Sequence, residues 1–238
     1  MDLGKPLTLI TPTVDAAVLS VLAGANTSFT GRQIHQIAGQ HSERGVRDAL
    51  QRLCAQGIVT KRTAGASNLF ALNRAHMAAP YIEALADLRT ELNRRITEAF
   101  ANWQIGPVTG AMFGSAARGN MNTDSDIDLL IVRPKNVQSD DTIWLSQLAD
   151  LAQLVTGWTG NDARIFELSE AEFRAGIITG EKVLVDIKAQ AIVLFGKDPF
   201  LGGPQTPNGK ERSGKSKKMY SENESGSVGK GAAIPARR

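Results

Sequence analysis

The sequence has few or none of several features that would each indicate a class of protein. Its 238 residues include a single cysteine, Cys54, so an internal disulfide is excluded and a reducing, cytoplasmic location is expected. No apolar run approaches the roughly 20 residues that cross a bilayer, and the first ten residues do not resemble a signal peptide. The three histidines form no site, and neither a zinc-ligand spacing nor a Walker-type phosphate loop is present. We therefore expect no membrane span, zinc centre or P-loop.

Charge is distributed unevenly along the chain. The formal net charge is +3, and it combines a basic front (residues 11–74), an acidic middle (75–200) and a basic end (201–238). The end is rich in Gly, Ser, Lys and Pro, so we expect it to be a disordered basic tail. This asymmetry predicts different partners for different segments, with DNA or RNA the natural partner of the basic ones.

Residues 11–74 read as three helices followed by two short strands, 58–62 and 68–72. Thr30 with Gln33, and then Ser42, mark the starts of the second and third helices. This order of elements resembles a winged helix-turn-helix domain. The resemblance implies contacts to DNA from the third helix and the hairpin, through Arg44, Arg47, Lys61 and Arg62. A small helical domain that binds protein is the alternative.

The following segment, residues 75–104, predicts one long linking helix over about 78–104. Its apolar residues recur at steps of three and four: Tyr81, Leu85, Leu88, Leu92, Ile96, Ala99, Phe100 and Trp103. At 1.5 Å per residue such a helix would be roughly 40 Å long. We expect it to pack on the next domain or to form a homodimer contact.

The stretch FGSAARGNMNTDSDIDLLIV, residues 113–132, carries the candidate chemistry. An apolar strand at 108–113 delivers Gly114 and Ser115 to the start of a helix, where backbone N–H groups can bind an anion. Gly114 lets a phosphate approach the backbone, Ser115 can donate its hydroxyl, and Arg118 adds a permanent positive charge.

A second strand follows at 127–132, with Asp126 and Asp128 at its start. Residues two apart on a strand share a face, so the two carboxylates are expected to point together. They would repel each other unless a cation bridges them, and Mg²⁺ is the natural choice beside substrate phosphates. The pattern therefore predicts a site for one or two Mg²⁺ ions.

The string from Phe113 to Asp128 resembles the nucleotidyltransferase superfamily typified by DNA polymerase β, especially its minimal members. The resemblance covers roughly residues 105–200 and implies transfer of a nucleoside monophosphate from a nucleoside triphosphate (NTP) to an acceptor hydroxyl, with release of pyrophosphate. It also implies a third acid on a later strand. We favour Glu167 for that role, as catalytic base or metal ligand, and Asp162 is its competitor.

The rest of that segment predicts helices at about 139–156, from Ser169 onward and at 181–188, and strands at 161–168 and 191–196. The expected fold is therefore α+β, with a winged helix, a linking helix, a small mixed sheet flanked by helices, and the tail. The rival function is a DNA-binding regulator, or an antitoxin-like partner, whose transferase-like domain senses nucleotide. The acceptor is not readable from the sequence.

Overall fold

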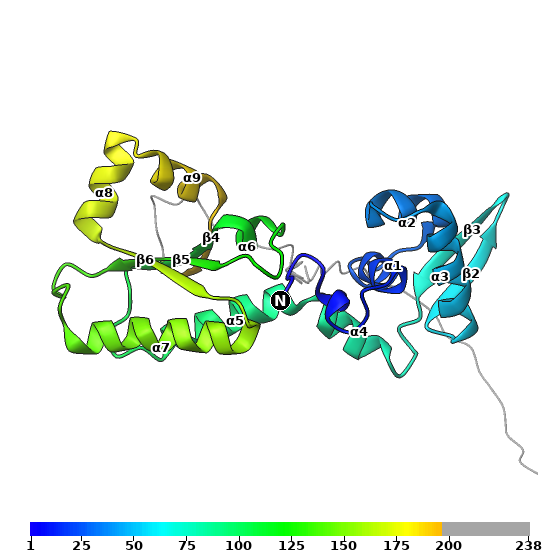
Figure 1. The fold of residues 1–238 in the computed structure, drawn as a ribbon, viewed down its shortest axis with the longest axis horizontal. Coiled ribbons are helices and arrows are strands. Elements are labelled where there is room, and N and C mark those ends of the chain that lie inside the picture. The colour runs from blue at the N-terminus through cyan, green and yellow to red at the C-terminus, as the bar shows by residue number, and fades with distance from the viewer. Residues whose placement is uncertain (197–238) are drawn as a thin grey trace, which may run out of the picture. The chain divides into compact units, whose positions relative to one another are not determined.

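A computed structural model describes residues 1–196, and the predicted tail at 201–238 lies outside them. The N-terminal part holds three helices and a three-stranded antiparallel sheet (Figure 1). In chain order these are a short 3₁₀ helix Pro6–Leu9, α1 Val14–Ala23, β1 Phe29–Thr30, α2 Gly31–Ala38, α3 Glu43–Ala55, β2 Val59–Ala64 and β3 Ser67–Leu72. The sheet order is β1-β3-β2, with β2 and β3 forming a hairpin.

Local capping explains where the second and third helices begin. The hydroxyl of Thr30 accepts the N–H of Gln33, and the Gln33 side chain accepts the N–H of Thr30, which completes a capping box. Ser42 caps α3 by accepting the N–H of Gly45. Both predicted starts are confirmed. The apolar sides of the helices meet in one core that includes Leu22, Ile34, Val46, Leu50 and Leu72.

The prediction of one long helix over 78–104 is wrong, because two helices occupy this segment: α4 Ala79–Ala86 and α5 Leu88–Ala101. Asp87 leaves the helical region with φ −104° and ψ 19°, and its N–H is shared between the carbonyl oxygens of Glu83 and Ala84. The break separates two cores. Ile82 of α4 belongs to the first core, whereas Leu92, Ile96 and Phe100 of α5 are buried in the second. These apolar residues of α5 are buried within the chain itself and are therefore not free to form a dimer contact. The homodimer stays a prediction.

A second, four-stranded sheet follows, in the order β6-β5-β4-β7. The strands are β4 Thr109–Phe113, β5 Ile127–Arg133, β6 Ala163–Ser169 and β7 Ile192–Phe195. The central β4 is antiparallel to β5 and β7, whereas β5 and β6 are parallel and are joined through α7, Thr142–Thr159. The predicted mixed sheet and the α+β class are thereby confirmed.

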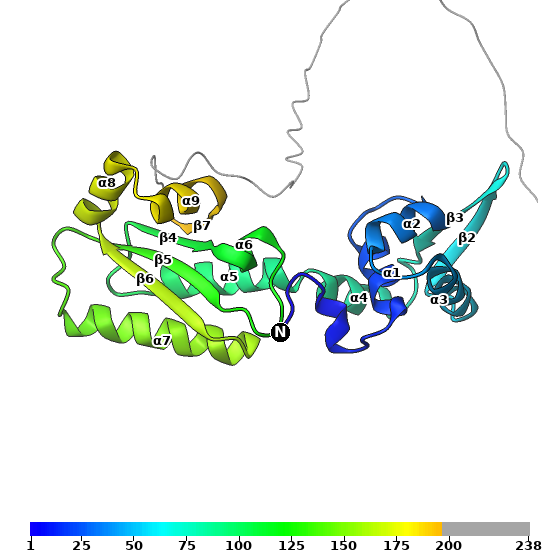
Figure 2. The ribbon, with the colours of Figure 1, turned by 45° about the horizontal axis from the view of Figure 1, so that its top comes forward.

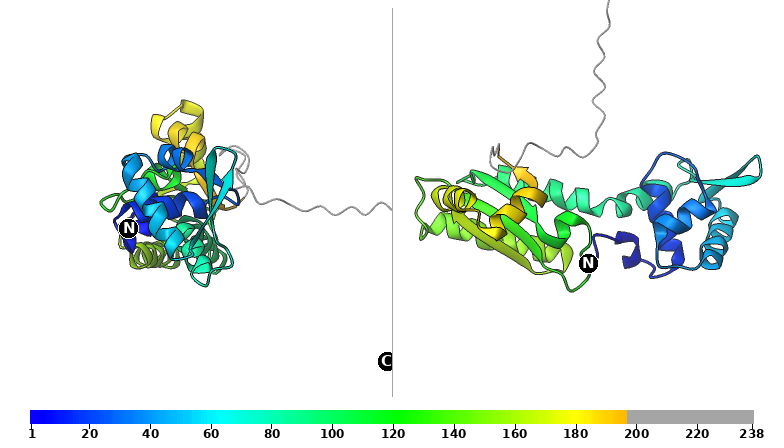
Figure 3. Two further views of the ribbon diagram at one scale, coloured as in Figure 1. Left: turned by 90° about the vertical axis from the view of Figure 1, so that its right-hand side faces the viewer. Right: turned by 90° about the horizontal axis from the view of Figure 1, so that it is seen from above.

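Helices cover both faces of this sheet (Figures 1 and 2). One face packs on α5 and α7 through Leu129, Ile131 and Trp144. The other packs on α8 Glu170–Thr179 and α9 Lys182–Gln190 through Leu130, Phe173 and Leu184. In the view from above, α8 and α9 lie over the strands (Figure 3, right). Side chains alternate between the two faces along β5, which decides where each polar residue of the site points.

Across residues 1–196, none of the helices is both long and apolar enough to span a bilayer.

Candidate active site

Gly114 and Asp128 lie against each other at the edge of the sheet where β5 begins. Phe113, the last residue of β4, pairs with Asp128 of β5, and α6 Gly114–Arg118 follows β4 directly (Figure 2). Gly114 has φ +69°, and a Cβ there would lie 3.2 Å from Cγ of Asp128 and closer still to its Oδ2. Glycine is therefore needed for two reasons, the backbone conformation and the carboxylate beside it.

The two aspartates of the Asp-x-Asp pair are electrostatic neighbours. Asp126 precedes β5 and Asp128 is its second residue, and both side chains are half-buried. Burial and the carboxylate of Asp126 raise the pKa of Asp128, while the positive charges of Arg164 and Arg118 oppose that rise. The structure thus brings Asp126, Asp128 and Gly114 together, and a cation between the carboxylates would relieve their repulsion.

Arg164 of β6 is the side chain that meets this pair. In the parallel β5–β6 register it stands directly beside Asp128. Its guanidinium Nη1 lies 2.9 Å from Oδ2 of Asp126, and its side chain is 72% exposed against 24% for Asp126. A positive charge therefore occupies the position next to the two carboxylates where the sequence led us to expect a third acid.

Glu167 lies elsewhere. It pairs in register with Ile131, three residues beyond Asp128, so its side chain is on the opposite face of the sheet. There its Oε1 accepts a hydrogen bond of 2.6 Å from Nε of Arg133, whose side chain is only 13% exposed. The structure does not bring Glu167 to the aspartates, because the register between β5 and β6 places its side chain on the other face of the sheet.

Asp162, the competitor for the third acid, immediately precedes β6. Its carbonyl oxygen accepts the N–H of Ile127 at 2.8 Å, which ties the start of β5 to the start of β6. Its side chain is exposed. Within residues 1–196, no group of three or more His, Cys, Asp or Glu side chains is placed to hold a metal ion. Two carboxylates still fit Mg²⁺ when phosphate oxygens of a substrate supply further ligands.

A cavity of about 460 Å³ opens beside Gly114, between α6 and α9. One side of α9 lines it with Lys182, Asp186 and Gln190, and Nη1 of Arg118 donates to Oε1 of Gln190 at 2.8 Å. A volume of this size suits a small ligand. Our reading of the sequence missed α9 here, because nothing local indicates that a helix 65 or more residues later returns to Gly114. The helix α6 has only five residues, and the positively charged side chains that line this cavity are Arg118 and Lys182.

Comparison with known families bears on this part of the chain. Residues 94–196 match the model described as "Nucleotidyltransferase domain". None of the curated proteins matches the chain. Among solved structures, the chain is similar to one described as "Crystal structure of the toxin-antitoxin with AMP-PNP", with 17% identity and a TM-score of 0.31 over 44% of this chain and 73% of that one.

Asn161 organises the loop that leads into Asp126. It is 3% exposed, and its amide nitrogen donates to the carbonyl oxygens of Ser125, Thr123 and Asn122 at 2.8, 3.1 and 3.4 Å. Its amide oxygen accepts a hydrogen bond from the amino group of Met1. A buried amide that binds several carbonyls holds the loop in one conformation. No local sequence signal marks this residue, because all of the partners of its side-chain amide are distant in the chain.

Replacing Asn161 with alanine is expected to lower the free energy of unfolding by about 2 kcal/mol, because the loop carbonyls lose a buried donor. Chemical denaturation of the full chain measures this change. Asn120→Ala in the same loop, where the side chain is exposed, is the matched control and should change the free energy by less than about 0.5 kcal/mol. Equal stability of the two variants would contradict the role given to Asn161.

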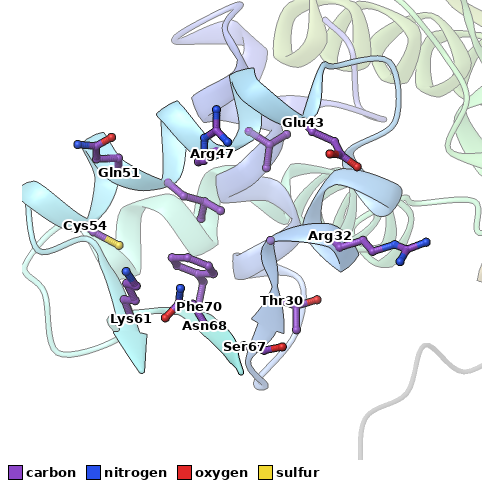
Figure 4. Close-up of a pocket in the computed structure, with 13 residues that line it drawn as sticks. Thr30, Arg32, Glu43, Arg47, Gln51, Cys54, Lys61, Ser67, Asn68 and Phe70 are labelled. Carbon is purple, nitrogen blue, oxygen red and sulfur yellow. The ribbon is translucent and has the colours of Figure 1, made fainter. Parts of the chain in front are cut away.

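In the N-terminal part, a second cavity of about 920 Å³ lies between α2, α3 and the β2–β3 hairpin. Figure 4 shows Arg47 and Gln51 of α3, and Lys61 and Phe70 of the hairpin, around it. Lys61 and Phe70 are cross-strand partners. Arg32, which the sequence analysis did not single out, also lines it, so three cations and one acid, Glu43, surround the cavity.

The structure places only two of the four residues predicted to contact DNA at this cavity. Arg47 and Lys61 line the cavity, whereas Arg44 and Arg62 do not. Arg44 is paired with Asp48 at 3.8 Å and its side chain is 84% exposed. Arg62 follows Lys61 on β2, so alternation along the strand turns it to the other face of the hairpin.

Proposed function

We propose that the protein is a metal-dependent nucleotidyltransferase that transfers a nucleoside monophosphate from an NTP to an acceptor hydroxyl. The observation that carries this proposal is the contact of Asp128 with Gly114, beside Asp126 and a cavity that contains Arg118 and Lys182. A carboxylate pair next to a backbone that phosphate can approach closely suits phosphoryl chemistry, in which catalysis consists largely of positioning and charge stabilisation. The match of residues 94–196 to the nucleotidyltransferase domain supports it independently.

In this proposal the phosphates of the NTP lie over Gly114 and Ser115, with Arg118 and Lys182 balancing their charge. Asp126 and Asp128 would hold Mg²⁺, which would supply positive charge to the phosphate oxygens. The acceptor oxygen forms a bond to the α-phosphorus, the bond to pyrophosphate breaks, and the hydroxyl proton is released to solvent. We assign no catalytic step to Glu167, because Arg133 holds it on the opposite face.

Incubation of the full chain with each of the four α-labelled triphosphates, Mg²⁺ and a cell extract tests the proposal and identifies the acceptor class. Label should appear in a macromolecule or small molecule, pyrophosphate should accumulate, and a chelator should abolish both. Small molecules, RNA ends and protein hydroxyls are the three acceptor classes to separate. Absence of transfer with all four triphosphates would overturn the proposal.

As a second candidate function, we propose that the N-terminal part is a winged helix that binds nucleic acid and directs or regulates the transferase. Three helices followed by an antiparallel hairpin support this proposal, as does the cavity that Arg32, Arg47 and Lys61 line. Positive side chains in such a position suit contacts to backbone phosphates. The rival role, a DNA-binding regulator whose transferase-like domain only senses nucleotide, differs in one respect: it predicts binding without transfer.

A pair of matched double variants tests which cations act. Arg47→Ala with Lys61→Ala should weaken binding of a duplex DNA fragment at least tenfold and reduce the salt dependence by about two phosphate contacts. Arg44→Ala with Arg62→Ala removes the same formal charge away from the cavity and should weaken binding less than about threefold. Gel shifts at several salt concentrations measure both effects. Equal losses in the two pairs would show that only net charge matters and would contradict the proposed binding face.

A further inference from the structure

The charge balance at Asp126 and Asp128 bears on whether the site holds one divalent ion or two. The aspartates contribute two negative charges, and the described chain brings no third carboxylate to them. The position beside Asp128 on β6 is instead held by Arg164, whose Nη1 is 2.9 Å from Oδ2 of Asp126. The nearest acid along β6, Glu167, is turned to the other face and bound by Arg133.

The guanidinium of Arg164 acts on both carboxylates. It is paired with Asp126, and in the parallel register of β5 and β6 it stands beside Asp128. An exposed ion pair of this kind contributes little to stability, so it is a weak reason to keep an arginine at this position. Its geometry is more informative: a permanent monovalent cation with a rigid fork of donors lies 2.9 Å from Oδ2 of Asp126, an oxygen that a second metal ion would need as a ligand.

We propose that Arg164 takes the charge-balancing place of a second divalent cation, so that the site binds one metal ion with the triphosphate and not two. This inference rests on the proposed function. Arg164 is a positioning residue: it pairs with Oδ2 of Asp126, so that the single ion would be held by Asp128 and the other oxygen of Asp126. A divalent ion and a guanidinium compete for the same carboxylate oxygen, so removing Arg164 should strengthen metal binding.

Metal stoichiometry tests the inference without any measurement of activity. The full chain is placed on one side of a dialysis membrane, and Mn²⁺ with α,β-methylene-ATP is present on both sides. The methylene bridge between the α- and β-phosphates of this analogue cannot be cleaved, so no nucleotide is transferred. At equilibrium the side that contains the wild-type protein should hold one more Mn²⁺ ion per chain than the other side. Arg164→Asp, which returns a carboxylate to the position beside Asp128, should bind two. Arg164→Ala should bind the first ion about five- to tenfold more tightly, because one competing ion pair is lost.

Two further variants make the result specific. Arg164→Lys keeps the positive charge and should remain at one ion. Arg174→Asp is the matched control, since Arg174 is also a partly exposed arginine in an ion pair of 2.9 Å, with Glu170 on α8; it should remain at one ion with unchanged affinity. Urea denaturation of each variant confirms that it is folded, as expected for a side chain that is 72% exposed.

The outcomes separate this inference from the proposed function. Two ions on the wild-type chain, or one ion on Arg164→Asp with unchanged affinity in Arg164→Ala, would overturn the role of Arg164 and leave the transferase proposal standing. No Mn²⁺ bound to any variant would overturn both. One ion on the wild type, two on Arg164→Asp and one on both controls would establish the inference.

Discussion

Replacing Asp126 and Asp128 together with asparagine is expected to lower nucleotide transfer about a thousandfold or more. Asparagine keeps the shape of both side chains but removes two negative charges, and with them the ability to hold a divalent cation against the phosphates. The fold should tolerate the change, because the mutual repulsion that raises the pKa of Asp128 disappears. The exposed ion pair with Arg164 is worth at most about 1 kcal/mol. Transfer of label from an α-labelled triphosphate measures the loss, and urea denaturation checks the fold.

Asp124→Asn is the matched control for this experiment. Asp124 lies two residues before Asp126 in the same loop and its side chain is exposed, so the substitution removes a carboxylate without touching the pair beside Gly114. Its transfer rate should stay within about twofold of the wild type. If the double variant transfers nucleotide as fast as this control does, the two aspartates do not carry the reaction.

Gly114→Ala is expected to lower both the stability of this part of the chain and its transfer activity. At φ +69° the left-handed backbone conformation destabilises an alanine by about 1 kcal/mol or more relative to glycine. Its Cβ would also overlap Oδ2 of Asp128, so the carboxylate or the turn must move. We expect the free energy of unfolding to fall by about 3 kcal/mol and transfer to fall at least a hundredfold, since a displacement of about 1 Å can cost that much.

A second glycine separates the two causes. Gly160 has φ +70°, and a Cβ added there would meet nothing within 4 Å. In Gly160→Ala only the backbone conformation is unfavourable. The substitution should lower the free energy of unfolding by about 1 kcal/mol and leave transfer unchanged. Should Gly114→Ala behave like Gly160→Ala in both measurements, the close approach of Asp128 to Gly114 would not be needed for activity.

Local patterns were enough to predict several parts of this protein. The caps at Thr30 and Ser42 and the strands around Gly114 and Asp128 follow from residues that interact with close neighbours in the chain. The two aspartates were found because residues that share a strand face are two apart, whatever surrounds the strand. The break at Asp87 was missed because the apolar spacing continues across it, although its two sides serve different cores.

The composition of the site around these aspartates depends on contacts between distant segments. Glu167 and Arg164 are three residues apart on one strand, and the sequence alone favours the acid. The parallel pairing of β5 with β6 sets Arg164 beside Asp128 and turns Glu167 to the opposite face, toward Arg133. Lys182 and Asn161 likewise reach the site from α9 and from the start of β6. The chemistry of the motif is encoded locally, whereas the charge that faces it is decided by strand register, a property of two segments paired across more than thirty residues.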